Sequence, residues 1–390
     1  MATPLFGTVC PGWESVRDEF LANLDSGEDL GAGVAVYHRG ECVVDLTGGW
    51  FDKGKTKEYT PDTLQLVFST TKGMAAIALA ILVERGQVDY AAPVSHYWPE
   101  FADHGKETAT VAQLLSHQCG LFTVDGPISL QEALDWNTIT SRLAATKPRW
   151  PIGSTHGYHA LTYGWLAGEL IRRADGRMPG RFVAEEIAGP LGLEMHIGLP
   201  AELEPRVSPL AAQPASGEPV DPAIAEMMAK FMGPDSNGGQ ALSLNGAFGE
   251  GVFNSREVHA AEIPAANGIT NAVSLARMYA ATMQPIDGVQ LMSDSIRECA
   301  TATVTPSGEA DACLIMPTTF GMGFMTHGPF MLYSGPGSYG HPGAGGSVGF
   351  AQHSRQLAFG YVMNQMASNL ANDMRAQRLM NAAAAVADSL

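Results

Sequence analysis

The sequence predicts an α+β fold: a mainly antiparallel sheet built from N- and C-terminal strands, flanked by helices, plus a mostly helical inserted lobe. Extended, β-rich runs gather near the two ends of the chain, while its middle consists of helical patterns separated by Pro- and Gly-rich loops. The connections between extended runs are hairpin-like, which favours antiparallel pairing. With 390 residues, 45% of them hydrophobic, the chain is long enough for two packed lobes. We expect a sheet domain from residues 1–86 and 321–390, a helical domain from 87–320, and a functional site between them.

Each element follows from its local pattern. An amphipathic pattern predicts a helix over residues 13–24, and the run GAGVAVYHRGECVVDLTGG predicts a hairpin that turns at Arg39-Gly40. The extended run at 63–69 leads into an apolar helix that ends near residue 87. The remaining expected helices cover 111–117, 163–174, 274–283 and 369–387, and the remaining extended runs cover 320–328, 347–354 and 356–364. The loop-rich section 205–251 is the least predictable.

Composition excludes several classes of protein. The net charge of −17, with 23 Lys and Arg against 40 Asp and Glu, argues against nucleic-acid binding. The N-terminus shows no signal peptide, and the longest apolar stretch, 74–83, is too short to span a bilayer. Five widely spaced cysteines without a CxxC pair indicate reduced thiols, and hence a cytoplasmic protein: Cys10, Cys42, Cys119, Cys299 and Cys313.

No metal or other cofactor is expected. Only His156 and His159, in the segment HGYH, approach the spacing of metal ligands. Two histidines without an indicated third ligand are more often ordinary structural histidines.

Ser69 and Lys72 form the strongest chemical signal. They lie one helical turn apart where an extended run meets a helix, so the Ser69 hydroxyl and the Lys72 amine can meet on one face. Free amides and the positive end of the helix suit a developing oxyanion. Burial would lower the lysine pKa from about 10.4, as a base requires. This is the only S-x-x-K match in the chain; the alternative is an N-capping serine beside a surface lysine.

Further motifs accompany this pair. The segments TVAQLLSHQCGL, PIGSTHGYHALTYGWLAGEL and PAANGITNAVSLARMYA, together with STTK, resemble the serine β-lactamase-like superfamily. That superfamily includes class C β-lactamases, D-alanyl-D-alanine peptidases and family VIII carboxylesterases. Cys119 stands where a serine or threonine is usual. The resemblance covers most of the chain, is weakest over 205–251, and implies a β-lactamase/transpeptidase-like fold.

The resemblance also implies roles for individual residues. Ser69 matches the nucleophile and Lys72 its proton-accepting or pKa-setting partner. Tyr158 matches the tyrosine of the Y-x-N box, which relays the proton; an adjacent ammonium would lower its pKa. The alternative is that Tyr158 is a buried core residue, with Tyr163 a nearby competitor for its role. Which of Lys72 and Tyr158 takes the first proton stays open.

A third set of residues matches the K-T-G box. His341, Pro342 and Gly343 occupy its place on the strand beside the nucleophile. The Ala344 amide would then pair with that of Ser69 in an oxyanion hole, and His341 would donate a hydrogen bond to the acyl or leaving group. The alternative is that this glycine-rich stretch forms only a tight strand entry.

Two departures favour the esterase branch. The asparagine of Y-x-N is Ala160 here, and the lysine of K-T-G is His341. In β-lactamases those groups are associated with the lactam's amide side chain and carboxylate. The expectation that the protein has no export signal favours the same branch.

Residues 345–349 also fit G-x-S-x-G, the nucleophile elbow of α/β-hydrolases. That fold needs an acid and then a histidine after the serine, whereas His353 precedes Asp373 here. We therefore interpret Ser347 as a strand residue.

These observations predict a serine carboxylesterase that hydrolyses small esters through an acyl-enzyme on Ser69. The alternatives are a β-lactamase or D-alanyl peptidase, an acyltransferase, and an inactive scaffold of the same fold. Retention of Ser69, Lys72 and Tyr158 together argues against the scaffold. The ester, its chain length and stereochemistry, and the oligomeric state stay open. Aromatic and methionine residues proposed to line an acyl pocket are Trp150, Phe231, Met232, Phe248 and Phe253.

Overall fold

Both ends of the chain build one antiparallel sheet, as predicted. A computed structural model describes residues 3–212, 226, 230–306, 308–367 and 372–390. Its seven-stranded sheet has the order β1-β3-β2-β10-β9-β8-β7, with every neighbouring pair antiparallel. The strands are β1 (Leu5–Val9), β2 (Gly31–His38), β3 (Glu41–Gly49), β7 (Met325–Thr326), β8 (Ser338–Pro342), β9 (Val348–Gln352) and β10 (Leu357–Met363).

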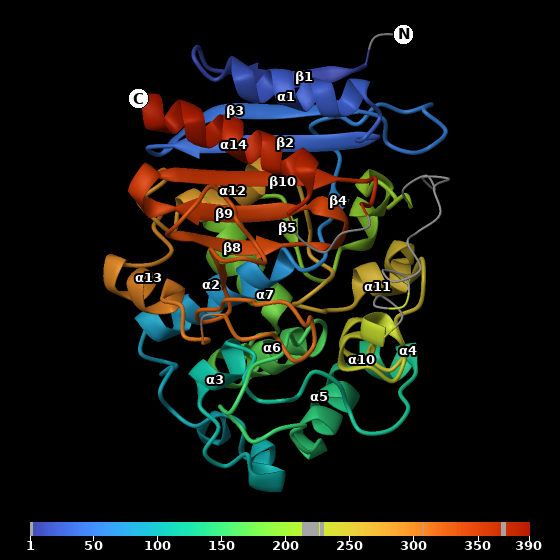
Figure 1. Ribbon diagram of the computed structural model, residues 1–390, viewed down its shortest axis with the longest axis vertical. Coiled ribbons are helices and arrows are strands. Elements are labelled where there is room, and N and C mark those ends of the chain that lie inside the picture. Colours follow the sequence, from blue (N-terminus) through green and yellow to red (C-terminus); the bar gives the residue numbers. More distant parts are fainter. Residues whose placement is uncertain (1–2, 213–225, 227–229, 307, 368–371) are drawn as a thin grey trace.

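Helices cover the two faces of this sheet (Figure 1). Helices α1 (Glu14–Asp25) and α14 (Met374–Ser389) pack together on one face, and α12 (Ala272–Ala280) and α2 (Thr71–Glu84) lie against the other. Alternation along β2 divides the core accordingly. Val34 and Val36 join the cluster of α1 and α14, whereas Ala35 and Tyr37 join that of α2 and α12. Strand β2 is therefore buried on both faces.

The α2 helix runs through the middle of the molecule. Twelve of its fourteen residues are buried. It packs against α6 (Thr162–Asp175) in the helical part and against β8 of the sheet. An apolar sequence on all sides of a helix is what such a central position requires.

Most helices of the described chain come between β4 and β7 in sequence, and Figure 1 shows α3, α5, α6 and α10 below the strands of the large sheet. Besides those whose bounds are given above, the described helices are α3 (Val111–Leu115), α4 (Leu130–Leu134), α5 (Trp136–Ala145), α7 (Pro179–Val183), α8 (Gly189–Leu191), α10 (Asn237–Ser243), α11 (Arg256–Ala260) and α13 (Asp294–Thr301). A second, three-stranded sheet has the order β4-β6-β5, formed by Gln65–Leu66, Ile269–Thr270 and Met195–His196. Because α12 comes from inside residues 87–320 yet packs on the large sheet, the exact division into domains stays a prediction.

Two segments differ from the sequence-based expectation. Strand β1 was not predicted; it is an edge strand with mostly exposed or half-buried residues, so it carries no clear alternation. The run 320–328 contributes only the two-residue β7. The expected helix over 369–387 is found as α14, while 369–371, and 213–225 and 227–229 of the loop-rich section, lie outside the described residues.

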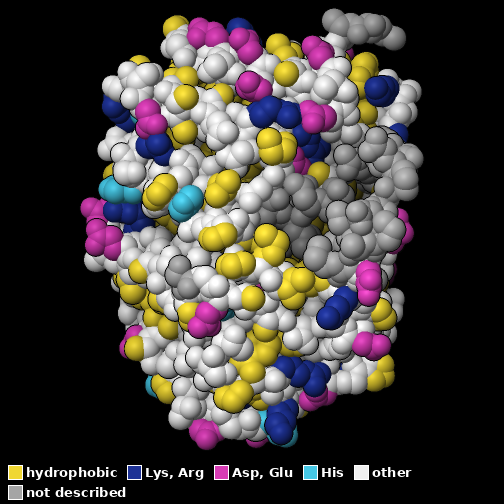
Figure 2. All heavy atoms as spheres, in the orientation of Figure 1, with side chains coloured by type: hydrophobic (Ala, Val, Ile, Leu, Met, Phe, Trp, Pro, Cys, Tyr) yellow, Lys and Arg dark blue, Asp and Glu magenta, His cyan; other side chains and the backbone are white. Residues whose placement is uncertain are grey.

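The surface agrees with the acidic composition. On the face shown in Figure 2, lysine and arginine side chains are interspersed with aspartate and glutamate rather than gathered in one basic area. Within the described ranges, no helix is long and apolar enough to cross a membrane.

Candidate active site

Ser69 lies in the turn that joins β4 to α2. The preceding residue, Phe68, has a positive φ of 44°, which a bulky side chain rarely adopts. Thr71 holds this conformation, since its hydroxyl donates to the Phe68 carbonyl at 2.5 Å and accepts from the Gly268 amide at 2.8 Å. The half-buried Ser69 thus stands at the start of a rigid helix.

The Lys72 amine has three partners. Its Nζ lies 3.2 Å from Ser69 Oγ, 2.6 Å from the carbonyl oxygen of Ala160 and 3.1 Å from that of Ala265. Burial holds the pKa of Lys72 well below its usual value. In the neutral amine, two N–H groups can donate to the two carbonyls, which leaves the lone pair for the Ser69 hydroxyl. This arrangement suits a base.

Tyr158 is brought to the same place from the loop before α6. Its buried ring lies 4.8 Å from Lys72 Nζ and is stacked on His341 and Phe320, with centroids 5.9 and 6.1 Å away. Burial raises the pKa of Tyr158, and the neighbouring Ser69 hydroxyl only partly opposes this. The pKa of Tyr158 is therefore raised, where the sequence analysis expected it to be lowered. Burial removes the water that would stabilise the phenolate, and Lys72, which burial keeps neutral, provides no positive charge beside it.

The competing tyrosine is placed differently. The ring of Tyr163 lies 5.8 Å from Lys72 Nζ, and its buried hydroxyl has no hydrogen-bond partner among the described residues. Tyr158, and not Tyr163, lines the cavity beside Ser69.

The predicted oxyanion loop also meets Ser69. Gly343 follows β8, and a Cβ there would come within 2.2 Å of both the Val67 carbonyl and Ser347 Oγ. Only glycine permits this close approach. Ala344 begins the short 3₁₀ turn that follows, and it lines the same cavity as Ser69. Within the described chain, the amides of Ser69 and Ala344 donate to no acceptor, so both are free for an oxyanion.

Ser347 has a structural position. It is buried, its hydroxyl donates to the Val67 carbonyl at 2.8 Å, and it hydrogen-bonds Thr70 Oγ1 at 3.0 Å. It thereby ties β9 to the turn that carries Ser69. Ser347 directly precedes β9 and is not part of the strand, so the predicted strand position is off by one residue.

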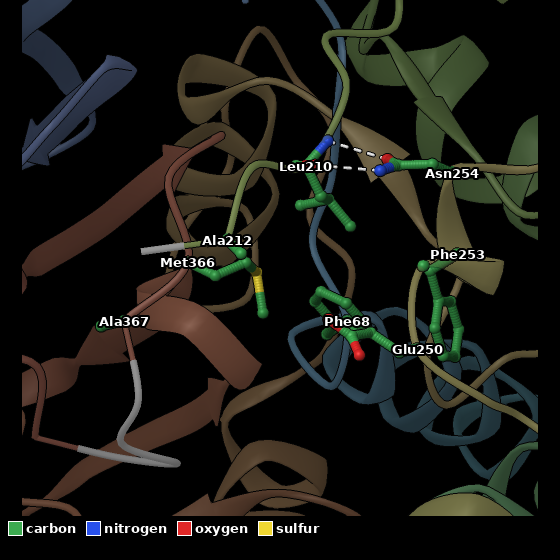
Figure 3. Close-up of a pocket in the computed structure, with 9 residues that line it drawn as sticks. Phe68, Leu210, Ala212, Glu250, Phe253, Asn254, Met366 and Ala367 are labelled. Atoms are coloured by element: carbon green, nitrogen blue, oxygen red, sulfur yellow. Dashed lines mark hydrogen bonds between the residues drawn. The ribbon is translucent and has the colours of Figure 1, made fainter. Parts of the chain in front are cut away.

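One cavity has Ser69 in its wall, and a second is lined by the preceding residue, Phe68. The smaller, of about 30 Å³, is lined by Ser69, Tyr158, Leu242, Leu314, Met325, Phe330, His341, Pro342 and Ala344. The larger, of about 440 Å³, begins at Phe68 and is mostly apolar (Figure 3). Of the five residues proposed for an acyl pocket, Phe253 is the one that lines it among the described residues; Met232 is exposed and Phe248 packs behind Phe253.

The two candidate metal ligands have protein partners instead. His159 Nδ1 donates to the Gly157 carbonyl and its Nε2 accepts from the Leu121 amide, at 2.6 and 2.8 Å. His156 hydrogen-bonds Thr318 at 3.0 Å. In the part of the chain that the structure describes, no three His, Cys, Asp or Glu side chains gather as a metal site.

Asp311 is a residue that the sequence analysis missed. Its buried carboxylate accepts from the amides of Tyr158, Cys313 and Leu314, at 2.9, 2.8 and 2.8 Å, and from the Thr318 hydroxyl at 2.8 Å. It therefore fixes the backbone of Tyr158. No local sequence pattern predicts this role, because Asp311 lies in a loop 153 residues after Tyr158.

Fold and site together define a serine hydrolase of the β-lactamase fold. A family model described as Beta-lactamase matches residues 17–384, and the chain belongs to this family. The resemblance seen in the motifs is thus confirmed.

Several relatives are similar over nearly the whole chain. Esterase/beta-lactamase LipL of Mycobacterium tuberculosis is 36% identical, covering 94% of this chain and 84% of that protein. A crystal structure of a penicillin-binding protein homologue from Caulobacter crescentus is 38% identical with a TM-score of 0.86, covering 98% of this chain and 100% of that one. A family VIII carboxylesterase structure is 34% identical with a TM-score of 0.87 and the same coverage.

Proposed function

We propose that this serine hydrolase is a carboxylesterase that cleaves small esters through an acyl-enzyme on Ser69. The observation that carries the proposal is the position of the Lys72 amine. Two carbonyl oxygens accept its hydrogen bonds, and its Nζ lies 3.2 Å from Ser69 Oγ. The names of relatives, an esterase/beta-lactamase and a family VIII carboxylesterase, support the same chemistry.

The geometry supports an order of proton transfers. Lys72, neutral because it is buried, takes the proton of Ser69 as Oγ bonds to the ester carbon. The amides of Ser69 and Ala344 stabilise the oxyanion. Tyr158, whose raised pKa keeps its proton in place, donates to the departing alkoxide and is reprotonated from Lys72. Water then releases the acid, and the serine regains its proton.

The lining of the cavities favours neutral substrates. Among the described residues that line the two cavities, none is lysine or arginine, and the one carboxylate is that of Glu250. Binding a substrate carboxylate, as β-lactams and D-alanyl peptides carry, needs a cation there. The larger cavity is mostly apolar and starts at the residue before the nucleophile, so we assign it to an apolar group of the ester.

Intact mass spectrometry after incubation with p-nitrophenyl acetate tests the proposal. The wild type should gain one acetyl group, transiently or in a quenched sample, and Ser69→Ala should gain none. Ser347→Ala, which alters the other motif serine, should still be acylated. Labelling of Ser69→Ala, or strong nitrocefin turnover by the wild type without ester turnover, would contradict the proposal.

A further inference from the structure

His341 lines the cavity that also contains Ser69 in its wall, and one nitrogen of its imidazole has no partner among the described residues. It is buried, and its Nδ1 lies 2.7 Å from the Pro342 carbonyl oxygen. A carbonyl oxygen only accepts, so the hydrogen of the ring is on Nδ1 and the lone pair is on Nε2. Burial, together with Lys72, holds the pKa of His341 well below its usual value, so the ring is neutral. The buried Nε2 has no hydrogen-bond partner in the described part of the chain.

This finding reverses the direction of the expected hydrogen bond. A ring with its hydrogen on Nδ1 cannot donate from Nε2 to the acyl or leaving group. It can only accept. Leaving such a buried acceptor without a partner is unfavourable, which indicates that a donor occupies the position during the reaction.

The cavity that His341 lines is large enough for a water molecule. It measures about 30 Å³ and also contains Ser69 and Tyr158 in its wall. A volume of about 10–15 Å³ on this measure accommodates one water, given two or more polar partners. Ser69, Tyr158 and His341 supply those partners, whereas the rest of the lining is largely apolar.

We propose that Nε2 of His341 accepts a hydrogen bond from the second O–H of the hydrolytic water, and so directs the acyl-enzyme to hydrolysis rather than transfer to an alcohol. This inference rests on the proposed function. An attacking alcohol has one O–H, which the Lys72–Tyr158 pair takes. Water has two, and the second needs its own acceptor.

The step balances without a further reactant. The water oxygen bonds to the acyl carbon, and one proton passes to the Lys72–Tyr158 pair. The bond from the acyl carbon to Ser69 Oγ then breaks, and that proton returns to Oγ. The second hydrogen stays covalently bonded to the oxygen that becomes part of the product acid, and this O–H donates a hydrogen bond to Nε2 throughout. The products are a free acid and the original serine.

Two substitutions distinguish the roles of the two ring nitrogens of His341. His341→Asn retains an N–H group near Nδ1 and removes the acceptor at Nε2. His341→Gln places an amide oxygen near Nε2. Each variant is given p-nitrophenyl acetate with ethanol or ethylamine as acceptor, and the ester, amide and acid products are quantified. The release of p-nitrophenol in the first turnover gives the acylation rate.

His341→Asn should acylate at close to the wild-type rate but hydrolyse about tenfold more slowly. The ratio of ethyl acetate to acetate should rise by the same factor, and the acyl-enzyme should accumulate. Ethylamine has two N–H groups, so the ratio of amide to acid should not change. His341→Gln should restore the wild-type ratios.

An unchanged ester-to-acid ratio in His341→Asn would overturn the inference, as would equal rises with ethanol and ethylamine. If His341→Asn is not acylated, His341→Phe, which keeps the ring stacked on Tyr158, replaces it in the same measurement. Failure of the wild type to form any acyl-enzyme would instead refute the proposed function.

Discussion

The carbonyl oxygen of Ala160 accepts a hydrogen bond of 2.6 Å from Lys72 Nζ. Ala160 stands where the Y-x-N box has an asparagine. In this protein that residue contributes its backbone carbonyl to the site and has no polar side chain to contribute. With the Ala265 carbonyl it fixes two of the amine's hydrogens and leaves one direction for Ser69. The loss of the asparagine therefore does not leave the lysine unsupported.

The pH profile should report the state of Lys72. Its pKa is well below the usual value, and only the unprotonated amine accepts a proton. Activity should therefore be lost as pH falls through this lowered pKa, and persist at pH values where an ordinary lysine is still charged. Lys72→Arg, which stays protonated, should lower kcat/KM roughly 100- to 10,000-fold. A profile of kcat/KM with an acid limb near the ordinary lysine pKa would contradict this account.

The sequence predicted the parts of the site that depend on side chains at short spacing. Ser69 and Lys72 are three residues apart at the start of α2, and Tyr158 follows a motif. The carbonyl of Ala265 and the carboxylate of Asp311 were missed. Every residue has a backbone carbonyl, so the sequence does not mark the one that binds Lys72, and a contact made by a loop produces no periodic pattern in the sequence. Of the small sheet, β4 lies within the predicted extended run 63–69, whereas β5 and β6 were missed. Tertiary contacts, not local preference, impose these two short strands and the strained Phe68.

Removing the phenol of Tyr158 should slow the reaction without unfolding the protein. Tyr158→Phe keeps the ring stacked on His341 and Phe320, and should lower kcat roughly 100- to 10,000-fold. Tyr163→Phe is the matched control, since its buried hydroxyl has no partner among the described residues; activity should stay near wild type. Steady-state kinetics and thermal melting check both variants, and equal loss in the two would remove Tyr158 from the mechanism.

A methyl group at Gly343 should displace the oxyanion loop. The Cβ of Gly343→Ala would lie 2.2 Å from the Val67 carbonyl, so β8 and the turn carrying Ser69 must separate. We expect kcat to fall about a hundredfold, the cost of a misplacement near 1 Å. Gly249→Ala, where a Cβ would meet nothing within 4 Å, should leave kcat unchanged. Burst kinetics with p-nitrophenyl acetate distinguish slow acylation from loss of folded protein; full activity in Gly343→Ala would argue against an Ala344 oxyanion role.

Arg375 should matter for both stability and the oxyanion loop. The buried guanidinium donates to Asp29 at 2.9 Å, to Asp373 at 2.6 Å, and to the carbonyl of Gly345 at 2.6 Å. Arg375→Met leaves two buried carboxylates without their cation, so the free energy of unfolding should fall by about 3–5 kcal/mol. The exposed Arg17, paired with Asp18, is the control: Arg17→Ala should change it by no more than about 0.5 kcal/mol. Urea titrations measure both, and equal effects would contradict the prediction.

The larger cavity should set the preference for the ester's apolar group. Phe253 meets Phe68 edge to face, with centroids 4.9 Å apart, so its ring forms a wall beside the residue that precedes the nucleophile. Phe253→Ala removes apolar contact of roughly 1–2 kcal/mol for a group lying there. The kcat/KM for p-nitrophenyl octanoate should fall about tenfold, while that for the acetate, too short to reach this wall, should change less than about twofold. Met232→Ala, at an exposed residue outside the cavity lining, should leave the ratio of the two unchanged. If Phe253→Ala lowers both esters equally, the cavity does not receive the substrate's apolar group.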